Sequence, residues 1–299
     1  MILQALADGI FTGAIIALGA IGLSLTLQIM RFANFAHAEF MTLGAYLALA
    51  ISSVIGPGTP TAGLTFGWQL LVAAMLASAA TGVGAWLLDL GVFRPLRQRG
   101  AQSLVLVFAA FGSALVLRHV LVLVWGPESY FYTRALQMAV TVPPGVRVMP
   151  DQVFILLLAL LLMAALHGFL TWHRTGIAMR AMAESPALAQ VCGIRVDTVV
   201  RTTWLISGAL AGVAGVFSGL TPQLHPELGF NLLLSVFAAA IFGGAGSLPG
   251  AVLGGLLVGI AENLFLLVVN PGYKPAMPFL LLLAVLWFRP QGLFGDKAH

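Results

Sequence analysis

Charged side chains are scarce in this sequence. Only 8% of its 299 residues are Asp, Glu, Lys or Arg, whereas 60% are hydrophobic, and the mean hydropathy is +1.01. A soluble globular protein carries about 25% charged residues, so this chain has too little polar surface to cover a globule in water. The composition predicts an all-α polytopic membrane protein, with one transmembrane domain over residues 1–299. At about 20 residues per crossing, it has room for about eight to ten transmembrane helices.

Lysine and cysteine are also rare, and their scarcity excludes several kinds of site. Lys274 and Lys297 are the two lysines, and neither lies in a GxxxxGK[ST] phosphate-binding loop. Cys192 is the single cysteine, which excludes an internal disulfide and a CxxC motif. The sequence also lacks HExxH and other zinc-ligand spacings, and its histidines have no nucleophile or base beside them. We therefore expect no enzymatic activity, no bound metal and no cofactor.

Positive charge is concentrated in three short tracts. Nine of the fourteen Lys and Arg residues lie in 94–99, 174–201 and 289–297, next to apolar runs. This distribution is typical of topology-setting charge, and it does not indicate nucleic-acid binding despite a sequence pI of 9.7. Two predicted spans separate the first tract from the second, so we expect both to be cytoplasmic and the 126–151 connector to be external. The side of the N-terminus stays open, and the opening apolar run is expected to be a first span rather than a signal peptide.

The charged segment 171–202 separates two apolar runs and is predicted to be a cytoplasmic loop. Thr175 is placed to cap a first short helix over 176–184, and Asp197 to cap the helix that leads into the next apolar run. An ordinary charged connector is the alternative interpretation. Two capped helices in a row, however, are more order than a connector needs.

A second short helix is predicted inside this loop, with the sequence PALAQVC. Ser185 stands at its N-cap and Pro186 at its first helical position. Gly193 follows where the end of a helix favours a residue that tolerates positive φ. An apolar face and two small residues predict docking to a partner that approaches closely. The face consists of Leu188, Val191 and Cys192, and the small residues are Ala187 and Ala189. The predicted contact segment is Glu184, Ser185, Pro186, Ala187, Leu188, Ala189, Gln190, Val191 and Gly193.

Polar residues interrupt an apolar run near the start of the chain. Asn34, His37 and Glu39 fall within six residues, which indicates either a short interfacial loop or a broken helix buried inside the protein. His37 and Glu39 are two positions apart and so face different sides of a helix. They either satisfy the backbone at the break or line a transport pathway, since polar groups at membrane depth are costly and usually functional.

A second interruption, GGAGSLPG, follows an apolar segment of about 13 residues, which is too short for a crossing of about 20. We predict a half-helix, a turn over 242–250 and a long helix. Both interruptions leave open backbone groups beside small side chains, and we expect them to face a translocation pathway from opposite sides of the subunit core. The predicted pathway residues are Asn34, Phe35, His37, Glu39, Gly243, Gly244 and Gly246.

Two further polar pairs lie within apolar runs. Glu262 and Asn263 are expected to form hydrogen bonds between packed helices or at the membrane interface. Arg118 and His119 lie near the end of a predicted span, and we expect both side chains to extend to the interface.

The ALAQVCG segment resembles the EAA loop of permease subunits in bacterial ABC importers. Ala187 stands where that family often has Glu, and the usual downstream Leu-Pro is absent. The rest of the chain resembles the high-affinity branched-chain amino acid permeases, in GAIIALGAIGLSLTLQIMRFANFAHAEFMTLGAYLA, RTGIAMRAMAESPALAQVCGIRVD, FAAAIFGGAGSLPGAVLGGLLVGIAE and FRPQGLFG, in that order. Ala38 replaces a Gly that is typical of the first motif. The resemblance covers nearly the full length.

The resemblance implies a multi-pass permease of the bacterial inner membrane. Its implied partners are two cytoplasmic ABC ATPases, a second permease subunit that is a copy or a paralogue, an extracytoplasmic substrate-binding protein and membrane lipid, with no nucleic acid. The 186–193 helix would couple the permease to the ATPases, and the cargo would be branched-chain or related amino acids.

Other cargoes and another class of transporter stay open. Relatives in this family also move urea and short amides. An ion-coupled secondary transporter or channel would instead use His37, Glu39 and Glu262 as ion ligands at mid-membrane. It would not need a docking helix.

Overall fold

We describe the protein from a computed structural model, which covers residues 1–56, 58, 63–133, 137–143, 145–220, 223–244, 246–289 and 292–294. Part of the predicted C-terminal basic tract, including Lys297, lies outside these residues, as does Ala245 of the predicted 242–250 turn. The helices are α1 Ile2–Met30, α2 Ala36–Ile55, α3 Trp68–Leu88, a π-helical turn Asp89–Phe93, α4 Arg94–Gln98, α5 Ser103–Trp125, α6 Pro150–Trp172, α7 Arg174–Glu184, α8 Pro186–Val191, α9 Val196–Leu220, α10 Leu228–Gly243, α11 Leu248–Phe265, a 3-10 turn Pro271–Tyr273 and α12 Ala276–Phe288. Two short strands, β1 Val140–Val142 and β2 Val146–Val148, form an antiparallel hairpin.

Seven described helical segments are long and apolar enough to cross a membrane: α1, α2, the continuous segment from α3 to α4, α5, α6, α9 and α11. The apolar helices α10 and α12 are shorter, with 16 and 13 residues. This confirms the prediction of an all-α polytopic membrane protein. The sequence of a half-helix, a turn and a longer helix at 228–265 is also as predicted.

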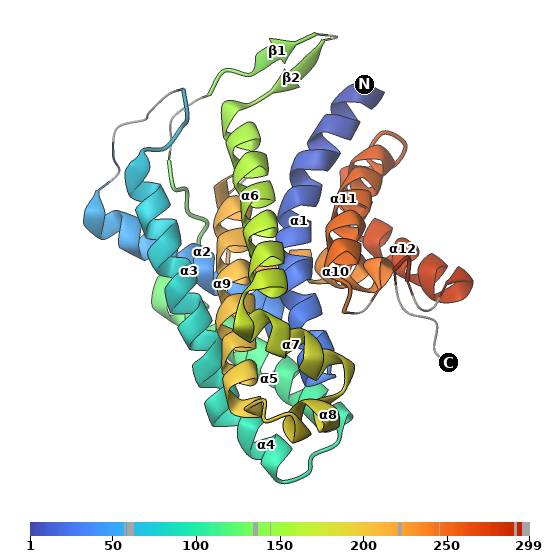
Figure 1. Cartoon of the computed structure of the whole chain (residues 1–299). Coiled ribbons are helices and arrows are strands. Elements are labelled where there is room, and N and C mark those ends of the chain that lie inside the picture. Colours follow the sequence, from blue (N-terminus) through green and yellow to red (C-terminus); the bar gives the residue numbers. More distant parts are fainter. Residues whose placement is uncertain are drawn as a thin grey trace.

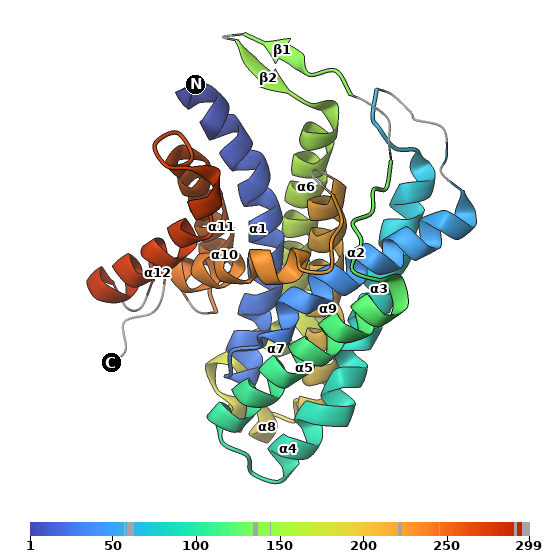
Figure 2. The same cartoon turned by 180° about the vertical axis from the view of Figure 1, so that it is seen from behind.

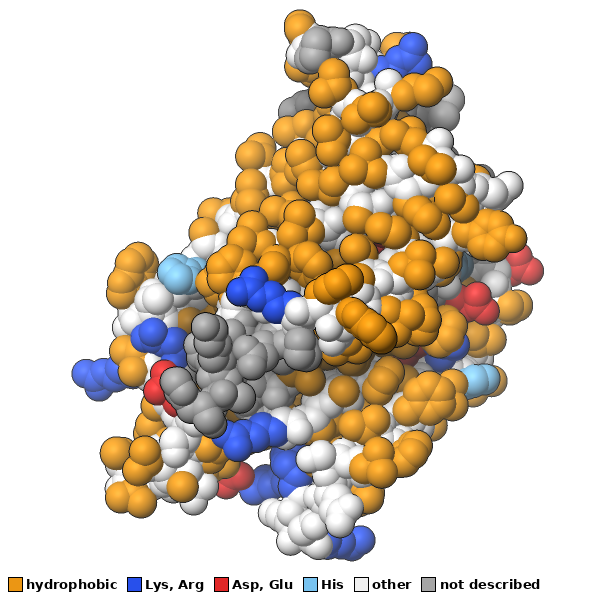
Figure 3. All heavy atoms as spheres, turned by 90° about the vertical axis from the view of Figure 1, so that its right-hand side faces the viewer, with side chains coloured by type: hydrophobic (Ala, Val, Ile, Leu, Met, Phe, Trp, Pro, Cys, Tyr) orange, Lys and Arg blue, Asp and Glu red, His pale blue; other side chains and the backbone are white. Residues whose placement is uncertain are grey.

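Helix α1 lies at the centre of the bundle, beside α6, α9 and α11 (Figures 1 and 2). Its contact with α11 is close because glycines line it: a Cβ on Gly13 would lie 2.8 Å from the Cα of Leu256. Small residues bring membrane helices together in this way where no hydrophobic effect drives their association. Helices α5 and α6 are mostly exposed by contrast, and hydrophobic side chains also cover much of the lateral face in Figure 3.

The two ends of the molecule match the predicted topology. Helices α4, α7 and α8 lie at one end, and the N-terminus and the β1–β2 hairpin lie at the other (Figures 1 and 2). The basic tracts 94–99 and 174–201 are therefore at the same end, which the positive-inside rule assigns to the cytoplasm. The N-terminus, whose side the sequence left open, lies at the external end.

The hairpin in the external connector was not predicted from the sequence. Gln4 of α1 holds it in place through two hydrogen bonds with Arg147: its Nε2 donates to the backbone oxygen at 2.9 Å, and its Oε1 accepts from the backbone N–H at 2.8 Å. The external end thus has a short ordered element attached to the central helix.

Candidate functional site

The short helix α8 begins as the sequence predicts. Ser185 is the N-cap, and its Oγ accepts a hydrogen bond from the backbone N–H of Leu188 at 3.4 Å. Pro186 occupies the first helical position, where its missing N–H costs nothing.

The end of α8 depends on Gly193, which has a φ of 80°. The N–H of Ile194 donates to the Ala189 carbonyl and the N–H of Gly193 to the Gln190 carbonyl, both at 3.0 Å. These two bonds define a Schellman motif, which needs a left-handed residue at the position of Gly193. A Cβ at this position would meet no atom within 4 Å, so the requirement for glycine is conformational rather than steric.

Helix α8 has one buried and one exposed side. Ala189 is 4% exposed and packs into the core, whereas Leu188 is 67% and Val191 is 86% exposed. The prediction that Ala189 faces a partner is therefore wrong, because this side chain holds α8 against its own subunit. Ala187 and Cys192 are exposed as expected. Exposed apolar side chains on a helix that buried contacts hold in place are typical of a docking site.

Helix α7, which precedes α8, is capped at its start by His173 and not by Thr175 as predicted. The Nδ1 of His173 accepts the hydrogen bond from the N–H of Thr175 at 3.2 Å, so His173 caps the helix and Thr175 lies inside it. Met179 and Met182 are buried against the core, and they attach this helix to the membrane domain.

Asp197 also has a different role from the one predicted. Helix α9 begins at Val196, so Asp197 lies in its first turn rather than at the cap. Its carboxylate pairs with Arg94 at 3.3 Å, which connects the start of α9 to α4 across the cytoplasmic end.

The first polar interruption is a broken helix. Helix α1 ends at Met30, its C-cap is Arg31, a non-glycine residue with a φ of 56°, and α2 begins at Ala36. The Oδ1 of Asn34 accepts the backbone N–H of Ala36 at 3.2 Å, and the residue is fully buried. Its Nδ2 has no hydrogen-bond partner among the described residues. The interfacial-loop alternative is therefore wrong, since the irregular backbone lies inside the protein.

His37 connects the break to two other helices. Its Nε2 lies 2.9 Å from the Gly19 carbonyl in α1, and its Nδ1 lies 3.3 Å from the Oγ of Ser207 in α9. A carbonyl only accepts, so the proton is on Nε2. The hydroxyl of Ser207 is also 2.8 Å from the Gly22 carbonyl. A Cβ on Gly22 would come within 2.8 Å of the ring, so this glycine makes room for the imidazole.

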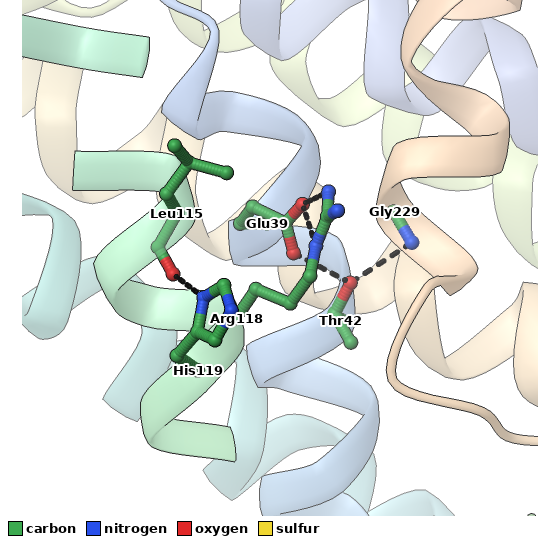
Figure 4. Close-up of polar contacts among 6 residues, drawn as sticks. All are labelled: Glu39, Thr42, Leu115, Arg118, His119 and Gly229. Carbon is green, nitrogen blue, oxygen red and sulfur yellow. Dashed lines mark hydrogen bonds and ion pairs between the residues drawn. The ribbon is translucent and has the colours of Figure 1, made fainter. Parts of the chain in front are cut away.

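Glu39 faces the opposite side of α2 and pairs with Arg118 of α5 (Figure 4). The carboxylate side chain is 2% and the guanidinium side chain 17% exposed. The prediction that Arg118 extends to the interface is wrong, because a buried carboxylate on another helix attracts it. The neighbouring His119 is exposed and bonds the Leu115 carbonyl at 2.7 Å.

This ion pair extends to α10. The hydroxyl of Thr42 donates to Glu39 at 3.4 Å and accepts the N–H of Gly229 at 2.9 Å (Figure 4). The Arg118 guanidinium also lies 4.4 Å from the centre of the Phe230 ring, within range of a cation–π interaction. The network therefore connects α2, α5 and the start of the short helix α10.

The second interruption, between α10 and α11, is closed by partners from both ends of the chain. Gly244 and Gly246 have φ values of 103° and 93°. The N–H of Gly246 donates to the Oγ of Ser24 in α1 at 3.1 Å. From the C-terminal side, the N–H of Leu293 donates to the Phe242 carbonyl at 2.8 Å, and the next residue bonds Gly243. Both interruptions therefore contact α1, the first through His37 and the second through Gly246.

Glu262 and Asn263 form contacts between helices, as one of the expectations held. The hydroxyl of Ser235 in α10 donates to Glu262 at 2.5 Å. Asn263 donates to the Thr12 hydroxyl in α1 at 3.4 Å, and also to the Gly259 carbonyl of its own helix at 2.9 Å. Within the part of the chain that the structure describes, no group of three His, Cys, Asp or Glu side chains is placed to hold a metal ion.

Comparison with known proteins places these features in a family. Residues 5–286 match the family described as "Branched-chain amino acid transport system / permease component". The chain is 33% identical to the high-affinity branched-chain amino acid transport system permease protein LivH of Escherichia coli (strain K12), covering 98% of this chain and 95% of that protein. The corresponding protein BraD of Pseudomonas aeruginosa gives the same identity and coverage.

More distant proteins are similar over the same length. A probable branched-chain amino acid transport permease protein LivH of Methanocaldococcus jannaschii is 29% identical, covering 96% of this chain and 92% of that protein. Among solved structures, PsaBC from Streptococcus pneumoniae in complex with Fab has a TM-score of 0.50 and 13% identity, covering 98% of this chain and 93% of that chain. This last similarity concerns the fold alone.

We expect Arg118→Leu to destabilise the protein strongly, because it leaves the buried Glu39 carboxylate without its cation, a change that costs about 3–5 kcal/mol. The double variant Glu39→Leu with Arg118→Leu should recover much of the loss. Thermal unfolding of the protein in detergent measures both. His119→Leu, at the adjacent exposed position, is the matched control and should change the midpoint little. A double variant that is less stable than Arg118→Leu alone would contradict the role of the pair.

Proposed function

The chain belongs to the branched-chain amino acid transport system permease family, and we propose that it carries branched-chain or closely related amino acids across the inner membrane as the permease subunit of an ATP-binding-cassette importer. The observation that carries this proposal is the family match along almost the whole chain. The relatives are transport permeases, and we infer that this chain likewise performs no chemistry of its own.

The energy for transport would come from separate ATPases that bind α8. Three features support this role: the cytoplasmic position of α8, its rigid start and end, and the exposure of Leu188 and Val191. The proposed contact segment is 184–193, with Ala189 as its inward anchor. The proposed assembly has two ATPases, a second permease that is a copy or a paralogue of this chain, and an external binding protein.

The contacts of the buried polar residues favour this mechanism over an ion-coupled transporter. Glu39 is paired with Arg118, Glu262 accepts from Ser235, and His37 is engaged with α1 and α9. An ion ligand at mid-membrane needs free lone pairs that face a water-filled route. These groups instead connect helices to one another.

We further propose that the two helix breaks border the translocation pathway. Asn34 keeps a buried amide nitrogen without a partner among the described residues, and Gly244 and Gly246 leave the second turn without side chains. One unpaired amide at the first break and small residues at the second suit a cargo that must be released quickly. In this proposal His37 supports the first break and does not carry protons.

Uptake by the reconstituted system tests the proposed function. The permease, its ATPases and the binding protein in liposomes should take up L-leucine only when ATP is present. Uptake by the permease alone under a proton or sodium gradient would favour the ion-coupled alternative. Uptake of urea or acetamide in place of L-leucine would reassign the cargo.

Gly193→Val should weaken ATPase binding while leaving the spans inserted, because a β-branched residue resists the φ of 80° at the end of α8. The left-handed conformation costs an ordinary residue about 1–2 kcal/mol, so we expect roughly a tenfold loss or more in co-purified ATPase. Gly193→Asn is the control, since Asn tolerates this conformation, and it should retain most of the ATPase. Normal ATPase binding by the Val variant would count against the docking role.

His37→Gln should keep substantial ATP-driven uptake, because a Gln amide can still donate towards the Gly19 carbonyl. His37→Leu should lose more, since it leaves the buried groups of α1 and α9 unpaired at a cost of about 1–3 kcal/mol. Initial uptake rates in assembled complexes provide the comparison. Complete loss in both variants, with normal assembly, would instead indicate that His37 titrates during transport.

A further inference from the structure

A cavity of about 340 Å³ opens in the external half of the protein, between α1, α6, α9, α10 and α11. Its volume is within the range of about 300–1,000 Å³ that is typical of small-molecule sites. The residues that line the cavity belong neither to the helix breaks nor to the docking helix. Its lining combines charged and amide side chains with buried aliphatic ones.

Opposite charges line this cavity. Asp8 of α1 contributes a carboxylate, and Lys274, between α11 and α12, contributes an ammonium group. Gln4 reaches both carboxylate oxygens of Asp8, at 3.1 and 3.2 Å, which leaves acceptor sites for another donor because a carboxylate has about four.

The ammonium group is only loosely engaged. Lys274 Nζ lies 3.8 Å from Glu262 Oε2, which is longer than a hydrogen bond. Glu262 is in turn bonded by Ser235 at 2.5 Å. Lys274 therefore has donors available to an anionic group that enters the cavity.

The remaining wall is apolar and well packed. Ile15, Ile155 and Leu228 line it and are at most 7% exposed. Asn231 also lines the cavity and is exposed, and a polar opening indicates access from water rather than from lipid. A ligand that carries both charges and an aliphatic group matches this lining.

We propose that this cavity binds an α-amino acid with an apolar side chain, with its ammonium group at Asp8 and its carboxylate at Lys274. The inference rests on the proposed function and deepens it, because it places a cargo site within the permease itself. Paired charges favour a zwitterion over neutral urea or a short amide, because a neutral ligand would remove water from Asp8 and Lys274 without offering them an opposite charge.

Ile16 lines the same cavity one helical turn before Gly19, the partner of His37. The site therefore lies next to the first helix break, on its external side.

Protection of an engineered cysteine tests the site directly. The Asn231→Cys variant is assembled with the second permease and the ATPases, and the binding protein is left out. The assembly is then labelled from outside with a membrane-impermeant maleimide. Cys192 lies at the cytoplasmic end and should not react. L-Leucine up to about 10 mM, enough to fill about nine-tenths of a site with a Kd of about 1 mM, should slow labelling several-fold. Val142→Cys on the external hairpin, outside the cavity, is the matched control and should label at an unchanged rate.

Charge variants and analogues then assign the two ends of the ligand. Asp8→Asn and Lys274→Gln should each abolish protection by L-leucine in complexes that still retain ATPase, whereas Lys274→Arg should keep part of it. 4-Methylpentanoate and 3-methylbutylamine, which each have one of the two charges, should protect weakly.

Uptake measured in parallel separates this inference from the proposed function. ATP-driven L-leucine uptake without any protection of Asn231→Cys, or wild-type protection in both charge-neutral variants, would overturn the site while the function stands. Protection without uptake would support the site and contradict the transport function. The absence of both would reject both.

Discussion

The hydrocarbon core of a membrane offers no hydrogen-bond partners, and this constraint decides where the chain leaves helical geometry. Both breaks are closed by the protein itself. Asn34 bonds the start of α2, and the turn after α10 is bonded by Ser24, Leu293 and Phe294. The buried Glu39 carboxylate likewise has its partner within the protein, the Arg118 guanidinium. The turn after α10 and the Glu39 pair depend on contacts with segments distant in sequence, as does His37 just after the first break. Those contacts hold the helices in one arrangement.

Helix α9 joins the docking helix to the membrane interior. It begins at Val196, shortly after the Schellman motif that ends α8, and continues to Ser207 beside the His37 ring. Asp197 in its first turn is also paired with Arg94 of α4. In the proposed mechanism, a displacement of α8 by the ATPase would pass through the short turn 192–195 to α9, and along α9 to the first break.

Much of the fold and part of the site follow from local sequence. Ser185, Pro186 and Gly193 specify α8 because capping depends on neighbouring residues. The short apolar segment before GGAGSLPG likewise predicts the second helix break, whereas the polar residues at 34–39 left a broken helix and an interfacial loop as alternatives. Long-range partners are not encoded locally, so the Arg118 contact with Glu39 and the inward side of Ala189 were missed. His173 was missed as a cap because histidine is a less common N-cap than threonine. The external cavity could not be predicted, since its residues come from five helices and from the α9–α10 and α11–α12 connections.

The contact between residues 292–294 and the turn after α10 has a consequence for biogenesis. The carbonyls of Phe242 and Gly243 receive their partners from Leu293 and Phe294, which the ribosome makes only after α11 and α12. Helix α10 is also shorter than the other spans. During synthesis these two carbonyls therefore lack their final partners until the chain has been made as far as Phe294, so the turn after α10 closes only after α12 has been made.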